Sequence, residues 1–233
     1  DRLRSAVASA GLSIPPSRIV VNLSPASIPK HGSGYDLAIA VAVLAAADVI
    51  EASVAARSVH LGELGLDGSI RPVPGVLPVV MAAAAAGVRH VVVPAASVAE
   101  ARLVEGVTVH AAATLGALVE AYAVSARRGG TLPVASALPG ICTPDRQVGD
   151  LADVVGQKEA REVVELAAIG GHHLLLTGPP GVGKTMLAER LVGVLPELTR
   201  AEALESQAIR SLAGVGQARG LDLTPPFEAP HHT

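Results

Sequence analysis

Hydrophobic residues in the first part of the chain fall into runs that alternate between strand-like and helix-like spacing. Short runs rich in Val and Ile predict strands, and longer Ala-rich or amphipathic runs predict helices. The predicted strands cover 18–26, 90–94 and 107–112, and the predicted helices cover 1–10, 36–49, 77–88, 97–104 and 114–122. This order of elements is typical of one compact α/β unit over residues 1–124.

Residues that begin or end elements support several of these boundaries. Gly11 and Gly87 follow predicted helices at the position where Gly commonly ends a helix. Thr114 is placed to cap the helix that follows it. The alternating stretch 58–73 contains Asp67-Gly68, a pair typical of a tight turn, and therefore predicts a hairpin.

The pattern changes after residue 124. Residues 125–147 contain Gly, Pro, Ser and Arg without periodicity, which predicts a linker. A second unit follows over 148–233. Its predicted elements are a helix bounded by Gly156 and Gly170–Gly171, a strand at His172–Thr177 and a helix at Met186–Val194.

Composition and charge exclude several classes of protein. Half of the 233 residues are hydrophobic, with two Tyr, one Phe and no Trp, so the core must consist of aliphatic side chains. The net charge of −3 argues against a protein that coats nucleic acid through general basicity. The single cysteine, Cys142, permits no intrachain disulfide and suits a cytoplasmic location.

Two further features concern membranes and the chain ends. The uncharged run Leu37–Ala47 is far short of the roughly 20 residues that span a bilayer, so we expect no membrane contact. The chain starts at Asp1 without a signal peptide, and its last residues show no helix stop. We expect it to be an internal part of a longer protein.

One motif in the second unit is highly specific. Residues 178–185 match G-x-x-x-x-G-K-[ST] at every fixed position, between a predicted strand and a predicted helix. The candidate nucleotide-binding residues are Gly178, Pro179, Pro180, Gly181, Val182, Gly183, Lys184 and Thr185. Backbone amides of such a loop surround a β-phosphate, and the alternative is a plain Gly-rich turn. We expect Lys184 to reach the β- and γ-phosphates and the Thr185 hydroxyl to bind Mg²⁺.

The sequence around this motif resembles the start of an AAA+ module of the magnesium-chelatase-like type, and "PPFEAPHHT" at the end resembles a stretch of the same group upstream of Walker B. With its N-terminal part, the whole chain resembles the ComM/YifB family of bacterial ATPases. The resemblance implies ATP and Mg²⁺ as cofactors, a hexameric ring and an ATP cycle that acts on DNA. It also places Gln157 in the segment leading to the adenine pocket; the alternative is a polar residue at a helix start.

The family pattern implies that this stretch of chain lacks part of the ATPase site. The Walker B acidic pair, the sensor and the arginine finger of the family would all follow Thr233. Without them, Mg²⁺ coordination is incomplete and no residue polarises the attacking water. We therefore expect residues 1–233 to bind nucleotide better than they hydrolyse it.

The N-terminal unit resembles the Lon-protease-type domain that such ATPases carry. Active members have a nucleophilic serine in a "PKDGPSAG"-like loop and a lysine at a helix start. Here the loop reads "PKHGSGYD", so Gly34 stands at the serine position, and Leu77 stands at the lysine position. Because a serine needs a base within reach, we expect no protease activity.

Ser33, His31 and Asp36 have the residue types of a hydrolase triad. Side chains two and three residues apart in one turn do not normally converge as nucleophile, base and orienter. We therefore interpret the stretch as a turn, with Asp36 near the first turn of a helix, where its charge suits the helix dipole. Lys30 and His31 are interpreted as a solvated rim, with a contact to a partner or nucleic acid as the alternative.

The remaining candidates carry less chemistry. His172 and His173 are adjacent on a predicted strand, so their side chains point to opposite faces and share a metal ion poorly. Arg127-Arg128 is too small for a nucleic-acid site. His231 and His232 match the family's "APHHT" stretch, which gives them no role by itself.

Three functions follow from these observations. The leading hypothesis is an ATP-binding AAA+ motor with an inactive Lon-like domain, which acts on DNA in branch migration during recombination or natural transformation. The second is the ATPase partner of a metal-chelatase complex, against which the Lon-like domain argues. The third, an ATP-dependent protease, is disfavoured by Gly34 and Leu77.

Overall fold

The computed structural model describes residues 2–16, 18–25, 27, 29–127, 132–135, 149–214 and 220–229. The chain divides into two compact units. The first unit contains residues 1–140 and 207–220, and the second contains residues 141–206 and 221–233. Each unit has its own arrangement of elements and is described separately.

A three-stranded parallel sheet forms the centre of the first unit. Its strands are β1 (Ser58–His60), β4 (His90–Pro94) and β5 (Thr108–Ala112), in the order β1-β4-β5. The central strand β4 is buried over Val91–Val93, as expected for a strand covered on both faces. The strands predicted at 90–94 and 107–112 are confirmed, and the parallel sheet confirms the α/β class.

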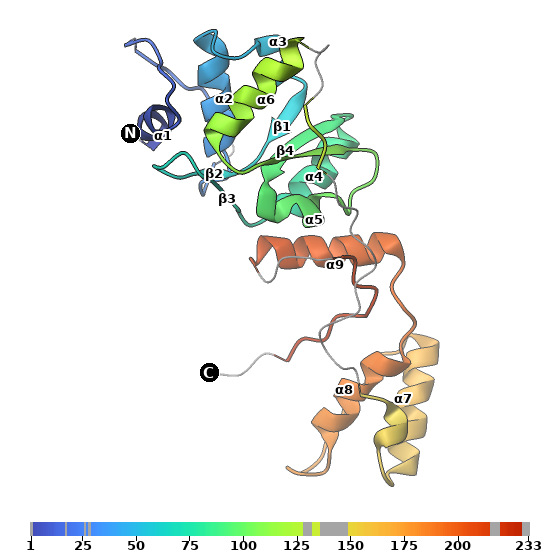
Figure 1. The fold of residues 1–233 in the computed structure, drawn as a ribbon. Helices are drawn as coiled ribbons and strands as arrows, with labels where there is room; N and C mark the ends of the chain where they lie inside the picture. The colour runs from blue at the N-terminus through green and yellow to red at the C-terminus, as the bar shows by residue number, and fades with distance from the viewer. Residues whose placement is uncertain are drawn as a thin grey trace. The chain divides into compact units, whose positions relative to one another are not determined.

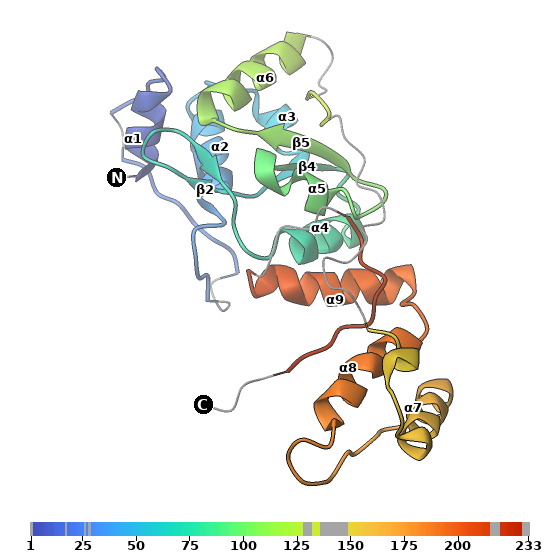
Figure 2. The same ribbon diagram turned by 60° about the horizontal axis from the view of Figure 1, so that its bottom comes forward.

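Helices cover both faces of this sheet (Figures 1 and 2). One face packs against α2 (Asp36–Ala46) and α6 (Leu115–Arg127), whose buried residues join Val92 in one hydrophobic cluster. The opposite face is covered by α4 (Val76–Ala85) and α5 (Val98–Ala101). The unit also contains α1 (Arg2–Ser9), α3 (Ala52–Ala55) and the 3₁₀ turn Ala95–Ser97.

The predicted hairpin is confirmed in the second half of 58–73. Strands β2 (Glu63–Leu64) and β3 (Ile70–Arg71) pair antiparallel around the turn that contains Asp67 and Gly68. Asp67 Oδ1 accepts hydrogen bonds from the backbone N–H of Ser69 at 3.1 Å and from its hydroxyl at 2.6 Å. These bonds stabilise the charged carboxylate and lower its pKa.

The strand predicted at 18–26 is wrong. The described residues of this stretch follow a path outside strands and helices, and Val20 is 77% exposed. β-branched residues favour a strand only when a neighbouring strand supplies hydrogen bonds and buries their side chains, and this stretch joins neither sheet of the described chain. The β-branched residues of 18–26 thus have the propensity for a strand, but they do not form one.

Several helix ends differ from the predictions; the helices predicted at 77–88 and 97–104, for example, end at Ala85 and Ala101. Helix α2 ends at Ala46 rather than Val49, because Asp48 adopts a left-handed conformation with φ of 57°. Helix α6 continues past Tyr122 to Arg127, three residues into the predicted linker, with Ser125 buried. Its start agrees with the prediction, since the Thr114 hydroxyl oxygen accepts a hydrogen bond from the Ala117 N–H at 3.2 Å.

The second unit contains helices around a small core. A 3₁₀ turn (Leu151–Asp153) leads to α7 (Lys158–Gly170), and α8 (Lys184–Val194) packs against α7. Helix α9 (Arg200–Leu212) begins in this unit, and its residues from Gln207 onward belong to the first. The core side chains are Leu151, Val154, Val164 and Leu187.

The strand predicted at His172–Thr177 is not formed. The segment alternates in burial as a strand does, with Leu174 and Leu176 packed against the core and Leu175 85% exposed. None of the described residues of this unit forms a strand that could pair with it, and extended backbone becomes a strand only through such pairing.

Among the described residues, no helix combines the length and apolar character that a membrane-crossing helix requires.

Candidate functional site

The glycine-rich loop 178–183 lies directly before α8, and Gly183 is the residue at the N-terminal cap of that helix. Gly181 and Gly183 both have left-handed backbones, with φ of 83° and 87°. A side chain is strained in this region, so the loop needs glycine at these positions. The first amides of a helix have no partner within the helix, which makes them available to an anion.

Lys184 is folded over this loop. Its ammonium donates hydrogen bonds to the carbonyl oxygens of Gly178 and Pro179, each at 2.8 Å. The ammonium of Lys184 is thus held against the first residues of the loop. The next residue, Thr185, has an exposed side chain in the first turn of α8.

Gln157 is brought to the same loop from the start of α7. Its side-chain amide Nε2 donates a hydrogen bond to the carbonyl oxygen of Val182 at 3.2 Å. The structure therefore places Gln157 beside the motif, although Gln157 and Val182 are 25 residues apart in sequence.

The loop has the chemistry that a magnesium nucleotide requires. Glycines leave room for phosphate oxygens, the helix start and Lys184 supply positive charge, and Thr185 supplies a hydroxyl that can bind Mg²⁺. Within the described ranges, no group of three or more His, Cys, Asp or Glu side chains is placed to hold a metal ion. The residues present thus fit a nucleotide that brings its own Mg²⁺, with Thr185 as the ligand from this chain.

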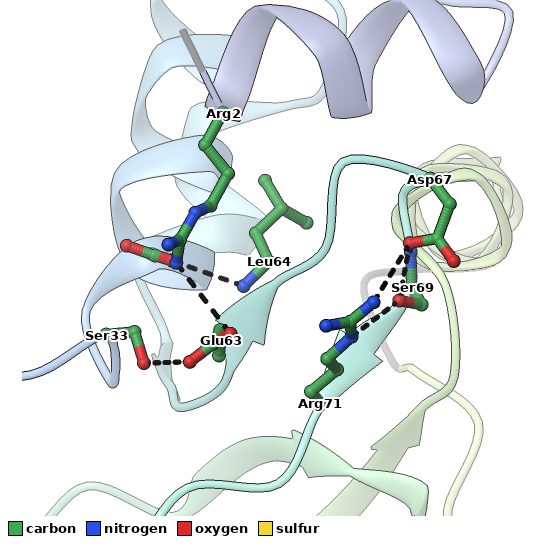
Figure 3. Close-up of polar contacts among 8 residues, drawn as sticks. Arg2, Ser33, Glu63, Leu64, Asp67, Ser69 and Arg71 are labelled. Atoms are coloured by element: carbon green, nitrogen blue, oxygen red, sulfur yellow. Dashed lines mark hydrogen bonds and ion pairs between the residues drawn. The ribbon is translucent and has the colours of Figure 1, made fainter.

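The loop around Ser33 forms a second polar cluster (Figure 3). The Ser33 hydroxyl donates a hydrogen bond to a carboxylate oxygen of Glu63, which precedes Leu64 on β2. Glycine at position 34 carries no nucleophile, and its carbonyl oxygen accepts a hydrogen bond from Gly62 N–H at 3.2 Å. Leu77 is fully buried in α4, so it is a core residue.

Asp36 has structural partners in the same cluster. Its Oδ2 accepts hydrogen bonds from Arg2 Nη1 at 2.7 Å and from the Leu64 N–H at 3.3 Å. The bond to Asp36 raises the pKa of the Arg2 guanidinium. Asp36 and Ser33 are joined only through the backbone, where the Asp36 N–H donates to the Ser33 carbonyl oxygen at 3.0 Å. Among the described contacts, no side-chain hydrogen bond links Asp36, Ser33 and His31, so they form no triad.

The two residues interpreted as a rim differ from each other. His31 is exposed, as a rim residue would be. The ammonium of Lys30 instead turns back and donates hydrogen bonds to the carbonyl oxygens of Leu23, at 3.0 Å, and Pro25. Lys30 therefore helps to fix the preceding loop.

A cluster of buried polar side chains on the sheet was missed by the sequence analysis. His60 on β1 and His110 on β5 both pair in register with Val92, so they lie on one face of the sheet. His60 Nε2 shares a hydrogen bond with the hydroxyl of Tyr122 from α6. The sequence held one sign of this cluster, a histidine in each of three strand-like runs. It did not show which of these strands would be neighbours in the sheet.

The hydrogen bonds of this cluster define its protonation. His110 Nδ1 lies 2.8 Å from the carbonyl oxygen of Pro133, which can only accept, so Nδ1 carries the proton. Its Nε2 then accepts from His90 Nδ1 at 3.1 Å. Burial lowers the pKa of His60 to about 4, with a smaller contribution from His110. Burial also lowers the pKa of His110 and raises the pKa of Tyr122 to about 12.

Of the remaining candidate residues from the sequence, some are exposed and the others lie outside the described residues. His172 and His173 are both exposed. Cys142, Arg128, His231 and His232 lie outside the described residues.

Comparison with known protein families gives two matches. Residues 1–97 match the model of subunit ChlI of Mg-chelatase, and residues 150–233 match the model of magnesium chelatase, subunit ChlI. The first match covers the Ser33 loop and strands β1 to β4, and the second covers the glycine-rich loop 178–183.

Several curated proteins match the chain over its whole length. An uncharacterised protein of Mycobacterium tuberculosis is 49% identical over 234 residues, YifB of Salmonella typhimurium is 41% identical over 233, and competence protein ComM of Haemophilus influenzae is 38% identical over 236. The chain covers 45% of each of these relatives, so it spans about half of their length. A shorter match of 44 residues, 48% identical, links 19% of the chain to 7% of the archaeal Lon protease of Thermoplasma volcanium.

Proposed function

The chain belongs to the magnesium-chelatase-like family that includes YifB and ComM, and from this membership we propose that it binds ATP with Mg²⁺ as part of an AAA+ ATPase that acts on DNA. The observation that carries the nucleotide proposal is the arrangement of the 178–185 loop. Lys184 lies over the loop, glycines form its turns, and α8 begins at its end. These features are the ones that phosphate binding requires.

The proposed nucleotide residues are those of the motif together with Gln157. Gly178, Gly181 and Gly183 allow close approach of the phosphates, Lys184 neutralises their charge, and Thr185 contributes to Mg²⁺ binding. Pro179, Pro180 and Val182 complete the loop. Because the family's Walker B pair, sensor and arginine finger are not among residues 1–233, we propose that these residues alone bind ATP with little hydrolysis.

The role on DNA rests on relatives rather than on the site. One relative, ComM, is named a competence protein, which supports a function in natural transformation or recombination. We propose a ring of identical subunits, hexameric as in related ATPases, whose ATP cycle moves DNA branches in the cytoplasm. The Lon-like unit would then serve as a docking or structural part, because it lacks the serine and lysine of active Lon domains.

A second candidate is the ATPase partner of a metal-chelatase complex. It is favoured by the two family models, both of which describe the ChlI subunit of magnesium chelatase. The whole-length matches to YifB and ComM support the first proposal more strongly.

One experiment separates the two candidates. Branch migration and strand displacement on forked DNA are measured for the full-length protein and for its Lys184→Ala variant. ATP-dependent activity that is lost in the variant supports the DNA motor. No activity on DNA, together with ATP-dependent binding to a metal-chelatase subunit, supports the second candidate.

A further inference from the structure

Gln157 has an unusual backbone conformation for a side-chain-bearing residue. Its φ and ψ are 48° and 43°, in the left-handed region, and it follows Gly156, whose φ is also positive at 75°. Residues other than glycine adopt this region at a cost, and such strain persists where the surrounding contacts require it. The contacts of the Gln157 side chain show what this conformation achieves.

The side chain reaches the last peptide of the phosphate loop. Nε2 donates to the carbonyl oxygen of Val182 at 3.2 Å. The same nitrogen lies against Gly183, where a Cβ atom would be only 3.0 Å away from it. Gln157 thus occupies the space that a side chain at position 183 would fill.

A hydrogen bond to the Val182 carbonyl also fixes the direction of the Gly183 N–H, because both groups belong to one peptide. The peptide bond is planar and trans, so its N–H points opposite to its C=O. Because the carbonyl is directed toward Gln157, the amide of Gly183 is directed away from Gln157, to the opposite side of the peptide. Amides at this point, just before the helix, are among those that bind phosphate in such loops.

We propose that Gln157 is a positioning residue for the nucleotide phosphates, which holds the Val182–Gly183 peptide in the orientation that presents the Gly183 N–H. The proposal rests on the proposed function, since it assumes that the loop binds a nucleotide. It differs from the role implied by the family resemblance, in which this segment leads to the adenine pocket. A positioning residue affects all nucleoside triphosphates equally, whereas a base contact affects one base more than another.

The main test replaces the donor without changing the size of the side chain. In Gln157→Glu, a carboxylate cannot donate to the Val182 carbonyl and repels it. We expect binding of ATP and of GTP to the full-length protein to weaken by the same factor, about five- to tenfold, as for the loss of one hydrogen bond. Glu159→Gln, which changes the charge in the first turn of α7 at an exposed position, serves as the control.

A second variant separates the side chain from the backbone. Asn tolerates the left-handed region well, but its shorter amide does not reach Val182. Gln157→Asn should therefore melt within a few degrees of the wild type and still bind both nucleotides several-fold more weakly. Wild-type affinity in this variant would overturn the proposal.

A measurement on the wild type needs no variant. In ¹⁵N-labelled protein, addition of ADP with Mg²⁺ should shift the Gly183 amide resonance strongly, and an unmoved resonance in nucleotide-bound protein would overturn the proposal. A loss of ATP binding without loss of GTP binding in Gln157→Glu would identify a base contact and also overturn it. If the wild type and Lys184→Ala both fail to bind any nucleotide, the proposed function falls, and this proposal falls with it.

Discussion

The ammonium nitrogen of Lys184 lies 2.8 Å from the carbonyl oxygen of Gly178, to which it donates a hydrogen bond. A second bond of equal length goes to Pro179. The two carbonyl oxygens hold the ammonium of Lys184 against the first residues of the loop. Gly178 and Pro179 are both exposed. Water can therefore replace the Lys184 ammonium at these carbonyl oxygens when the lysine side chain turns to a phosphate.

Lys184→Ala should therefore abolish most nucleotide affinity while leaving the fold intact. A hydrogen bond to a charged group contributes about 1.5–3 kcal/mol, so the Kd for ATP is expected to rise about 10- to 100-fold. The free energy of unfolding should change by less than about 1 kcal/mol, because the carbonyls it leaves are exposed to water.

Titration calorimetry with ATP and Mg²⁺ and denaturant unfolding check the two parts of this prediction. Lys158→Ala is the matched control, because Lys158 is also a lysine at the start of a helix and its side chain is 89% exposed. Equal ATP affinity in the wild type and in Lys184→Ala would contradict the role given to Lys184.

The buried histidine His60 should make the stability of the first unit depend on pH. Its pKa in the folded protein is about 4, below the ordinary 6.5, so between these values the unfolded chain binds a proton that the folded chain does not. The free energy of unfolding therefore decreases as the pH is lowered from about 6.5 to about 4, and this contribution levels off below. For His60 alone the decrease is about 3 kcal/mol.

His60→Asn removes this titration and should reduce the slope of stability against pH in that range, with a remainder from His110, whose pKa is lowered in the same direction. His31→Asn is the control, because His31 is exposed. Urea unfolding at several pH values measures the slopes. A slope unaffected by His60→Asn would show that His60 is not kept neutral by the fold.

Ser33 is expected to be inert as a nucleophile. Its hydroxyl donates to Glu63, and the neighbouring position that matches the Lon nucleophile is Gly34, while Leu77 is buried in place of a lysine. Ser33→Ala should leave peptide hydrolysis at background and lower the free energy of unfolding by about 1 kcal/mol, through loss of the bond to Glu63. A fluorophosphonate probe that labelled the wild type but not Ser33→Ala would refute this.

Features set by a few adjacent residues were predictable from the sequence. The hairpin around Asp67-Gly68 and the Thr114 cap formed as predicted, because each depends on a turn type or a side-chain bond within three residues. The helix α8 also starts at the end of the glycine-rich loop, where the motif requires it.

Features that depend on distant partners were not predictable. Residues 18–26 and 172–177 have strand-like composition, but a strand needs a neighbour, and the pattern along one segment does not say whether a neighbour is present. The pairing of His60 with Tyr122 joins residues 62 positions apart and depends on which helix covers the sheet. Gln157 was identified by family resemblance, whereas its bond to Val182 follows from how α7 and α8 pack.

Two glycines of the glycine-rich loop 178–183 separate the effect of backbone strain from the effect of the contact with Gln157. Gly181 and Gly183 have nearly equal φ, 83° and 87°. A Cβ at Gly181 would meet nothing within 4 Å, whereas a Cβ at Gly183 would lie 3.0 Å from Gln157 Nε2 and 3.2 Å from Met186 Cε. Gly181→Ala therefore adds strain alone, roughly 1–2 kcal/mol, and Gly183→Ala adds strain and displaces the glutamine.

Gly183→Ala should consequently destabilise the second unit more than Gly181→Ala does, and its effect should depend on Gln157. Once Gln157→Ala has removed the obstructing amide, the additional cost of Gly183→Ala should approach that of Gly181→Ala. A double-mutant cycle in denaturant unfolding measures this coupling, and Gly181→Ala with Gln157→Ala provides the uncoupled comparison. Additive effects of Gly183→Ala and Gln157→Ala would mean that the amide does not pack on Gly183, because two residues in contact must share part of their energetic cost.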